Sequence, residues 1–318
     1  MATRHDTTEE IQSALARFKT YLYGELNLNE STIENYVGVM KRAVPVIGLK
    51  PTLAQARDYL SELRQRGDGY SHLTVTAVGL ERFLRSIGRR DFKLPRPRKP
   101  SQKEIEPLSE VEVALILRAC ETPRQKAMFA LLAYSGCRNK ELCQMQISDV
   151  DTAGQMVTIR GKGGDYRRVN IAGECAKIIS DYLNEEQRII NDHRNNLKKP
   201  KNKTEQHRAE IQRKRIERMT VTPDRLLFLS VRHGEPLEQQ DVRKNTRLAA
   251  KRAGLSGRVW PHLFRHSLAC SLVDRGANVF TIQHQLGHRH LSTTLKYLHP
   301  SATQAARQYH ACVPRYGS

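Results

Sequence analysis

Residues 286–300 read LGHRHLSTTLKYLHP, a stretch in which three histidines lie close to one tyrosine, Tyr297. The pattern is compatible with three kinds of site. Clustered histidines can bind a metal, a basic helix can read DNA, and a tyrosine hydroxyl can be a nucleophile. We expect a helix that begins at Ser292, contains Tyr297 and ends near His299. The choice between the three kinds of site depends on the rest of the chain.

The chain is strongly basic. Its 318 residues carry 53 lysines and arginines against 33 acidic residues, so the formal charge is +20. A charge of this size suits a polyanion, either nucleic acid or an acidic membrane surface. No apolar run approaches the roughly 20 residues that span a bilayer, and the N-terminus MATRHDTTEEIQSALARF has no apolar core of a signal peptide. We therefore expect a cytoplasmic, nucleoid-associated protein that binds nucleic acid and has no membrane partner.

The length predicts two domains. Residues 1–95 are expected to form a bundle of short helices. Ile11, Leu15, Phe18 and Leu22 share one face of the first helix. Three more helices are expected: residues 31–44, capped by Ser31 and ended by Pro45; residues 52–66, capped by Thr52 and ended by Gly67; and residues 71–87, capped by Ser71 and ended by Gly88.

A basic linker follows the bundle. Residues 96–106 lie within KLPRPRKPSQKEIEP, whose prolines and cations favour an extended segment. The second domain, residues 107–318, is predicted to be mostly helical with a hairpin at 156–171, which carries Lys162 in its turn GKGGD. The polar segment 185–220 is expected to be a solvated excursion whose outer parts could be helix, broken near Pro200, with contact to the DNA backbone as the alternative. The chain from residue 224 onward is expected to be helical. The fold class is thus mainly α with a small β-hairpin or sheet (α+β).

Residues 261–276, PHLFRHSLACSLVDRG, predict a helix that begins at Pro261 and ends at Gly276. His262 and Arg265 then lie one turn apart on the same face. His262 and His266 are four residues apart, as zinc ligands often are. The residues between them are Leu-Phe-Arg, which departs from the HExxH pattern and brings a cation to the site. We therefore expect no metal and no cofactor.

Arg138 lies in SGCRNKEL, two residues after Gly136, which should end the preceding helix. A cation at the start of the next helix opposes the helix dipole. Two explanations stay open for this position: a functional cation exposed in a cleft, or a surface ion pair with Glu141.

Taken together, SGCRNKEL, IRGKGG, HLFRH and LGHRHLSTTLKY resemble the tyrosine recombinase, or phage integrase, family. The order arginine, lysine, HxxR, GH and tyrosine is the motif of that family. The gaps of 23 residues from Arg265 to His288 and of nine residues from His288 to Tyr297 resemble those of Xer-type members. The resemblance extends over the whole chain, because the family also has an N-terminal helical bundle and a basic linker. It implies a SAM-like core-binding bundle followed by a mostly helical catalytic domain.

By that resemblance Tyr297 is the nucleophile that forms a 3′-phosphotyrosyl intermediate, without metal or ATP. The residues expected around the phosphate are Arg138, Lys162, His262, Arg265 and His288. Arginines suit this position because their guanidinium groups stay charged and can bind phosphate oxygens in pairs. Lys162 is the expected general acid for the leaving oxygen, and His262 or His288 is expected to accept the tyrosine proton. His290 and His299 have no assigned role.

The expected partner is double-stranded DNA that carries a specific recombination site. In the segment DVRKNTRLAAKR, the residues Arg243, Lys244 and Arg247 are candidates for DNA contact, although a solvated helix face is nearly as consistent with the pattern. The resemblance further implies a homo-tetramer in the synaptic complex, with residues 303–318 docking on a neighbouring subunit, and leaves accessory DNA-bending proteins open as additional partners. Two alternative activities are a type IB topoisomerase-like enzyme and a non-catalytic DNA-binding protein of the same fold.

Overall fold

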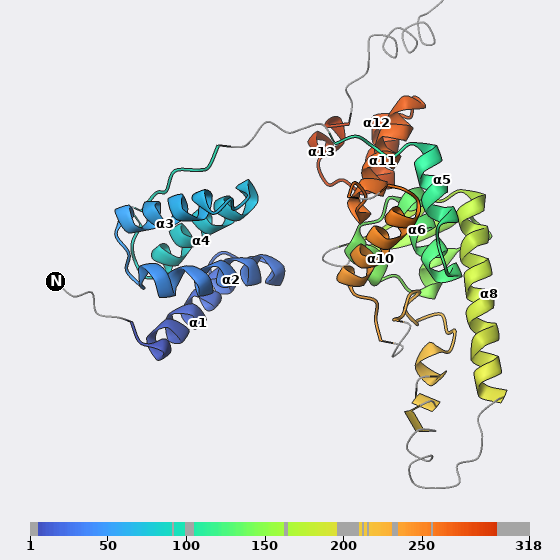
Figure 1. Cartoon of the computed structure of the whole chain (residues 1–318), viewed down its shortest axis with the longest axis horizontal. Coiled ribbons are helices and arrows are strands. Elements are labelled where there is room, and N and C mark those ends of the chain that lie inside the picture. Colours follow the sequence, from blue (N-terminus) through green and yellow to red (C-terminus); the bar gives the residue numbers. More distant parts are fainter. Residues whose placement is uncertain are drawn as a thin grey trace, which may run out of the picture. The chain divides into compact units, whose positions relative to one another are not determined.

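The computed structural model describes residues 6–90, 92–98, 105–161, 165–195, 210–211, 213–214, 216–230, 235–255 and 257–297. The chain divides into two compact units, Met1–Glu104 and Ile105–Ser318, which are described separately (Figure 1).

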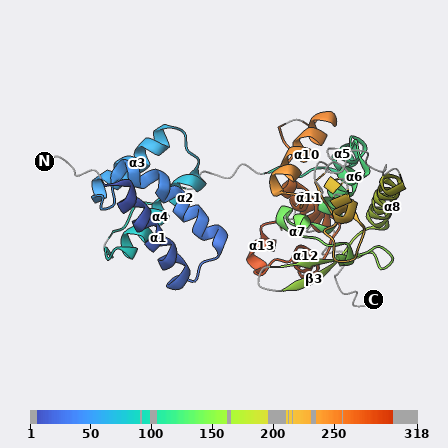
Figure 2. The same cartoon turned by 90° about the horizontal axis from the view of Figure 1, so that it is seen from below.

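The first unit is a bundle of four helices in its described part. They are α1 (Thr8–Gly24), α2 (Glu30–Ile47), α3 (Leu53–Gln65) and α4 (Tyr70–Ser86). The apolar face expected in α1 is confirmed: Leu15, Phe18 and Leu22 are buried, and Phe18 meets Phe83 of α4 edge to face, with ring centroids 5.3 Å apart. The predicted helical bundle is therefore present (Figures 1 and 2).

Three expected helix boundaries in this unit are wrong. Helix α2 is capped by Asn29 instead of Ser31, and it continues through Pro45 to Gly48, which has φ 76°. Pro45 lies on the exposed side of the helix, where water can replace the hydrogen bond that a proline cannot donate. Helix α4 is capped by Gly69 instead of Ser71.

The core of the first unit extends past its last helix. Phe92 and Leu94 are buried, the Leu94 N–H donates to Glu81 Oε1 at 2.7 Å, and Arg96 Nη2 donates to Glu81 Oε2 at 2.6 Å. The predicted linker 96–106 stays a prediction, because residues 99–104 lie outside the described part of the chain.

The second unit is mostly helical, as expected. Its elements are α5 (Glu110–Arg118), α6 (Pro123–Ser135), α7 (Asn139–Cys143), η1 (Ile147–Asp149), β1 (Val150–Asp151), β2 (Met156–Arg160), β3 (Tyr166–Asn170), α8 (Gly173–Asn195), α10 (Gln239–Arg252), α11 (Pro261–Asp274), α12 (Val279–Leu286) and α13 (Leu291–Leu295). Helix α6 lies at the centre, packed against α5, α8 and α11 (Figure 2). Because α6 is surrounded on most sides, residues around its whole circumference are buried. Phe129 of α6 stacks on Phe264 of α11 with centroids 6.0 Å apart.

A three-stranded antiparallel sheet in the order β1-β2-β3 packs on this helical core. The predicted hairpin is confirmed: β2 pairs with β3, and the buried Val157 lies opposite the buried Val169. Strand β1 was not predicted. The turn of the hairpin, residues 162–164 with Lys162, lies outside the described residues. The fold class, mainly α with a small sheet, is therefore as expected.

The segment before α10 departs from the helical expectation. Residues 224–238 form no described helix; instead Leu226 bridges Gln146 and Leu229 bridges Pro236 in antiparallel fashion. Tertiary contact explains the difference, because the Leu227 N–H donates to the Met145 carbonyl at 2.7 Å and Phe228 is buried. An apolar run this short does not distinguish strand from helix.

The start of the polar segment 185–220 is helical, as was expected to be possible for its outer parts, but it is not wholly solvated. Helix α8 continues to Asn195, Ile190 is buried, and Arg225 Nη2 forms an ion pair of 2.5 Å with Glu186, with both side chains largely buried. The helix therefore carries packing residues past position 185, which a count of charged residues does not reveal.

Candidate active site

The predicted site residues of the second unit come from four separate elements. Arg138 precedes α7, His262 and Arg265 belong to α11, His288 follows α12, and Tyr297 follows α13. The charges of Arg138 and Arg265 both act on His262, on His288 and on Tyr297. The fold thus brings together the predicted catalytic residues except Lys162, which lies outside the described residues.

Arg265 is buried, with 5% of its surface exposed. Its Nη1 donates to the Gly136 carbonyl at 2.7 Å, while its buried Nη2 has no hydrogen-bond partner among the described residues. Burial and the neighbouring charge of Arg138 lower the pKa of Arg265 to about 10, so it stays charged at neutral pH. Gly136 ends α6 with φ 63°, and a Cβ there would lie 2.8 Å from Leu286 Cδ2. The predicted glycine helix stop therefore also orients the carbonyl that anchors Arg265.

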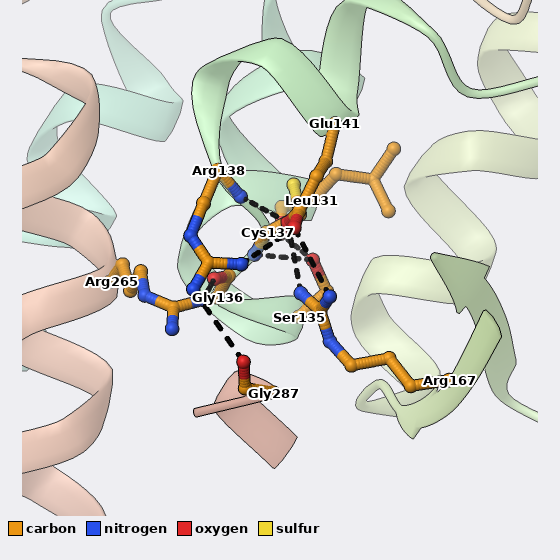
Figure 3. A network of polar contacts seen from close by, with 9 residues as sticks. All are labelled: Leu131, Ser135, Gly136, Cys137, Arg138, Glu141, Arg167, Arg265 and Gly287. Carbon is orange, nitrogen blue, oxygen red and sulfur yellow. Dashed lines mark hydrogen bonds and ion pairs between the residues drawn. The ribbon is translucent and has the colours of Figure 1, made fainter. Parts of the chain in front are cut away.

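A buried carboxylate, Glu141, holds two arginines (Figure 3). Its Oε1 accepts from Arg138 Nη1 at 2.7 Å and from Arg167 Nη1 at 3.1 Å, and its Oε2 accepts from Arg167 Nη2 at 2.8 Å. Burial alone would raise the pKa of Glu141, but the hydrogen bonds from Arg167 and Arg138 outweigh it and hold the pKa at about 2. The ion pair of Arg138 with Glu141 is present and leaves the Arg138 side chain 41% exposed. The role of Arg138 as a functional cation stays a prediction.

Sequence reasoning missed Arg167. This β3 residue lies under the turn that follows α12, and a Cβ on Gly287 would stand only 2.4 Å from Arg167 Nε. Gly287 has φ 63°, and its carbonyl accepts weakly from Arg138 Nη2 at 3.5 Å. Glycine at position 287 thus serves both the left-handed cap and the close approach of the guanidinium group. Nothing in the local sequence around Arg167 signalled this contact.

His288 is held rigidly. It is 8% exposed, its backbone N–H donates to the Gln283 carbonyl at 3.1 Å, and its carbonyl accepts from Gln283 Nε2 at 3.0 Å. Its Nδ1 lies 2.8 Å from Oγ1 of Thr294. Burial and the charges of Arg265 and Arg138 lower the pKa of His288 to about 4, so the imidazole is neutral at neutral pH.

His262 lies one turn before Arg265 on α11, as predicted. Its side chain reaches solvent, and its remaining burial together with the charges of Arg265 and Arg138 lowers its pKa below the usual 6.5. At neutral pH His262 is therefore uncharged and has a free ring nitrogen for a proton.

Tyr297 is half-buried against the apolar cluster of α11 and α12. Its ring lies parallel to that of His288, with centroids 6.1 Å apart, and 5.3 Å from the ring of His266. Burial raises the pKa of Tyr297, although the charges of Arg265 and Arg138 oppose this rise. The phenol is therefore protonated at neutral pH and needs a proton acceptor before it can attack.

The expected position of Tyr297 inside the last helix is wrong. Helix α13 ends at Leu295, and the Tyr297 N–H donates to the Thr294 carbonyl at 3.0 Å, three residues back instead of four. The tyrosine therefore lies on a tight turn at the end of α13. The end expected near His299 lies outside the described residues, as does the tail 303–318.

An open groove of about 830 Å³ runs beside these residues. Arg138, Arg160, Arg167, His288 and Arg289 are among the side chains that line it.

The three cations predicted to contact DNA, Arg243, Lys244 and Arg247, are exposed on α10, and the charge of Arg243 contributes to the low pKa of His262. Within the part of the chain that the structure describes, no three His, Cys, Asp or Glu residues are grouped as metal ligands, and no helix is long and apolar enough to cross a membrane.

Comparison with known proteins gives a consistent family assignment. The family model described as phage integrase family matches residues 106–304. Tyrosine recombinase XerC of Halalkalibacterium halodurans is 29% identical over 320 residues, 95% of this chain and 97% of that relative. XerC of Bacillus subtilis is 26% identical and covers 96% of this chain and 98% of its own. For XerD of Staphylococcus saprophyticus, 29% identical over 213 residues, the match spans 64% of this chain and only 62% of that relative.

Two solved structures share the fold. One is a Tn1549 transposon integrase in complex with transposon right end DNA, with a TM-score of 0.66 and 17% identity over 95% of this chain and 99% of that one. The other is the XerH site-specific recombinase bound to difH substrate, with a TM-score of 0.63 and 16% identity over 98% of both chains. The match of the family model covers more than half of the sequence, so this chain belongs to the phage integrase family.

Proposed function

We propose that this chain is a site-specific DNA recombinase that cleaves and rejoins DNA strands through a 3′-phosphotyrosyl intermediate on Tyr297. One observation carries the proposal: the half-buried tyrosine lies within reach of two arginine charges and beside a neutral histidine, and one of these arginines has a buried Nη2 without a partner among the described residues. A phosphate is the ligand that such a group of cations suits. Family membership and the XerC relatives support the same activity.

In this proposal Arg138 and Arg265 bind the non-bridging oxygens of the scissile phosphate. Their anchors, Glu141 and the Gly136 carbonyl, fix both guanidinium groups before DNA arrives. Preorganised charge stabilises the transition state without further rearrangement, and one such donor is commonly worth about 3 kcal/mol. His288 adds a hydrogen bond to the same oxygens.

The protonation states of the side chains support the remaining roles. His262 accepts the proton of Tyr297, directly or through the phosphate, because it is neutral at pH 7. The phenolate oxygen then bonds to phosphorus while the bond to the 5′-oxygen breaks. We assign Lys162, which lies between β2 and β3 in the sequence, to donate a proton to that leaving oxygen. The phosphotyrosine keeps the energy of the cleaved bond, so a 5′-hydroxyl of another strand can reverse the same steps without ATP.

We propose that both domains bind the same DNA duplex. We propose that residues 1–95 are a core-DNA-binding domain, residues 96–106 a basic linker, and residues 107–318 the catalytic domain with its tail. Arg243, Lys244 and Arg247 on α10 bind the DNA backbone near the groove, since phosphate contacts supply most of the affinity of DNA-binding proteins. The working partners are a double-stranded recombination site, three further copies of the chain in a synaptic tetramer, and accessory DNA-bending proteins. The protein acts in the cytoplasm at the nucleoid.

A covalent trapping experiment tests the proposal. The recombination site is obtained by sequencing junctions from cells that carry the gene, and a duplex with that site is nicked beside the cleavage position, so that the short released strand diffuses away. Wild-type protein is expected to form a covalent protein–DNA adduct, and Tyr297→Phe is expected to bind the duplex equally well without forming one.

Other outcomes would identify the alternatives. An undiminished adduct with Tyr297→Phe contradicts the assignment of the nucleophile. Binding without any adduct indicates a non-catalytic DNA-binding protein. Efficient relaxation of plasmids that lack the site indicates a topoisomerase-like enzyme.

A further inference from the structure

The hydroxyl group of Thr294 has an unusual partner for a threonine in a helix. Helical threonines commonly donate to the carbonyl four residues back, as Thr74 and Thr246 do in this chain at 2.8 Å. Thr294 is completely buried in α13, yet its Oγ1 lies 2.8 Å from Nδ1 of His288. Among the described residues this ring nitrogen is its one hydrogen-bond partner. The hydroxyl is therefore directed at the histidine instead of at its own helix.

This contact bears on which nitrogen of His288 carries the proton. A neutral imidazole has one N–H group and one acceptor nitrogen, and the bond made by one nitrogen determines what the other presents. If Thr294 donates to Nδ1, the proton resides on Nε2. The ring then offers a donor on the side away from α13. If Nδ1 donates to Thr294, Nε2 is an acceptor and His288 would act as a base.

The surroundings favour the first arrangement. Arg138, Arg167 and Arg265 all act on the His288 ring, so this corner is arranged for an anion. A phosphate oxygen accepts hydrogen bonds and cannot donate one, so a lone pair on Nε2 would repel it. We propose that Thr294 is a positioning residue that keeps the proton of His288 on Nε2, so that His288 donates to the scissile phosphate and is not the base. The inference rests on the proposed recombinase chemistry and leaves His262 as the acceptor of the tyrosine proton.

Thr294 also contacts the nucleophile segment. Its carbonyl accepts from the Tyr297 N–H at 3.0 Å, and the Tyr297 ring lies parallel to His288 at an interplanar angle of 8°. One residue therefore fixes the phosphate-binding histidine with its side chain and the turn that presents the tyrosine with its backbone. The side-chain contact can be removed by mutation while the backbone contact remains.

The first test compares three variants in the trapping assay. Thr294→Val keeps the shape of the side chain and removes the hydroxyl, Thr294→Ser keeps the hydroxyl, and Thr293→Val is the matched control on the same helix, where Thr293 is only half-buried. Thr294→Val is expected to slow adduct formation about tenfold to a hundredfold, by analogy with the loss of a partner that orients a metal-ligating histidine. Thr294→Ser and Thr293→Val are expected to stay close to the wild-type rate, and all are expected to bind the duplex equally well.

The second test reads the tautomer directly and needs no DNA. In the free full-length protein, the ¹⁵N chemical shifts of His288, assigned with His288→Gln, are expected to show a protonated Nε2 and an unprotonated Nδ1 at pH 7. Thr294→Val is expected to release this constraint and give a mixture of tautomers, whereas Thr294→Ser keeps the wild-type pattern.

Three results of these tests would contradict the role of Thr294. A protonated Nδ1 in the wild type overturns the proposal, as does a Thr294→Val variant that cleaves at the wild-type rate or a Thr294→Ser variant as slow as Thr294→Val. Failure of the proposed function looks different, because wild-type protein itself would then form no adduct. If Thr294→Val fails to fold, the wild-type spectrum and the Thr294→Ser rate still decide.

Discussion

Arg265 is anchored at one nitrogen and unpaired at another. Nη1 is bound by the Gly136 carbonyl, and Nη2 is buried without a partner among the described residues. Leaving a buried donor unpaired costs about 1–3 kcal/mol, and a structure tolerates that cost where a ligand supplies the missing acceptor. The planar guanidinium group of arginine can bind the Gly136 carbonyl and a ligand together, because it donates in two directions at once. An ammonium group on a flexible stem cannot reproduce this geometry.

This argument predicts the effect of Arg265→Lys. The variant keeps the charge but cannot span the Gly136 carbonyl and a phosphate oxygen together, so we expect the rate of adduct formation to fall by about 10²- to 10³-fold, as for the loss of one preorganised donor. The matched control is Arg275→Lys at the end of the same helix, where the arginine is exposed and paired with Glu110. Equal rates for the two variants would remove Arg265 from the phosphate site.

At the scale of elements, the turn between α12 and α13 links the site together. Gly287 ends α12 in the left-handed conformation and lies against Arg167 of β3, and the next residue is His288. Arg167 in turn binds Glu141, which binds Arg138 at the start of α7. Strand β3 and helix α7 are thus joined by partly buried ion pairs, and the α12–α13 turn is joined to them by the hydrogen bond from Arg138 to the Gly287 carbonyl (Figure 3).

Replacement of Gly287 by alanine tests this link, with Gly276→Ala as its control. Both glycines have positive φ, 63° and 79°, but a Cβ at 276 meets no described atom within 4 Å, whereas a Cβ at 287 meets Arg167. The left-handed conformation alone costs alanine about 1–2 kcal/mol. We expect Gly276→Ala to lose that much free energy of unfolding and keep its cleavage rate.

Gly287→Ala is expected to lose more free energy of unfolding than the control and to lose cleavage, because Arg167 must move away from Glu141. Urea unfolding followed by the fluorescence of Trp260, the single tryptophan, measures the first quantity, and the trapping assay measures the second. Equal unfolding free energies and equal rates for the two variants would show that the contact with Arg167 is unimportant.

At the scale of the whole molecule, the net charge of +20 suits a protein that binds DNA. In the site, cations lie close to one another. Arg138 and Arg265 lower the pKa of both His262 and His288. In the free protein these two histidines therefore resist protonation, so the protein is expected to be sensitive to acid.

The pKa of His288, about 4 against the usual 6.5, determines the direction in which the free energy of unfolding changes with pH. Between pH 6.5 and 4 the unfolded chain binds a proton that the folded protein does not, so the free energy of unfolding falls as the pH falls, by up to about 3 kcal/mol from this residue. His262 contributes with the same sign. Urea unfolding at several pH values, monitored through Trp260, should show the decline, and it should be shallower in His288→Gln, which does not titrate. The same slope in both proteins would contradict the low pKa.

The sequence by itself determined the features that depend on local chemistry. Capping at Thr52, the glycine stop at 136 and the hairpin at 156–171 follow from residues that are close together along the chain. The family was likewise recognisable from short motifs, because their order and spacing are specific.

Only the tertiary structure decided the features in which distant segments meet. Pro45 was tolerated inside α2 because it faces solvent, and the run Leu226–Leu229 became extended because Met145 offered a carbonyl. Arg167 and Thr294 joined the site through contacts with Glu141 and His288. Hydrogen bonds and burial depend on which surfaces pack together, and packing joins residues that may be over a hundred positions apart in sequence, as with Arg265 and Gly136. Local sequence patterns therefore do not predict such partners.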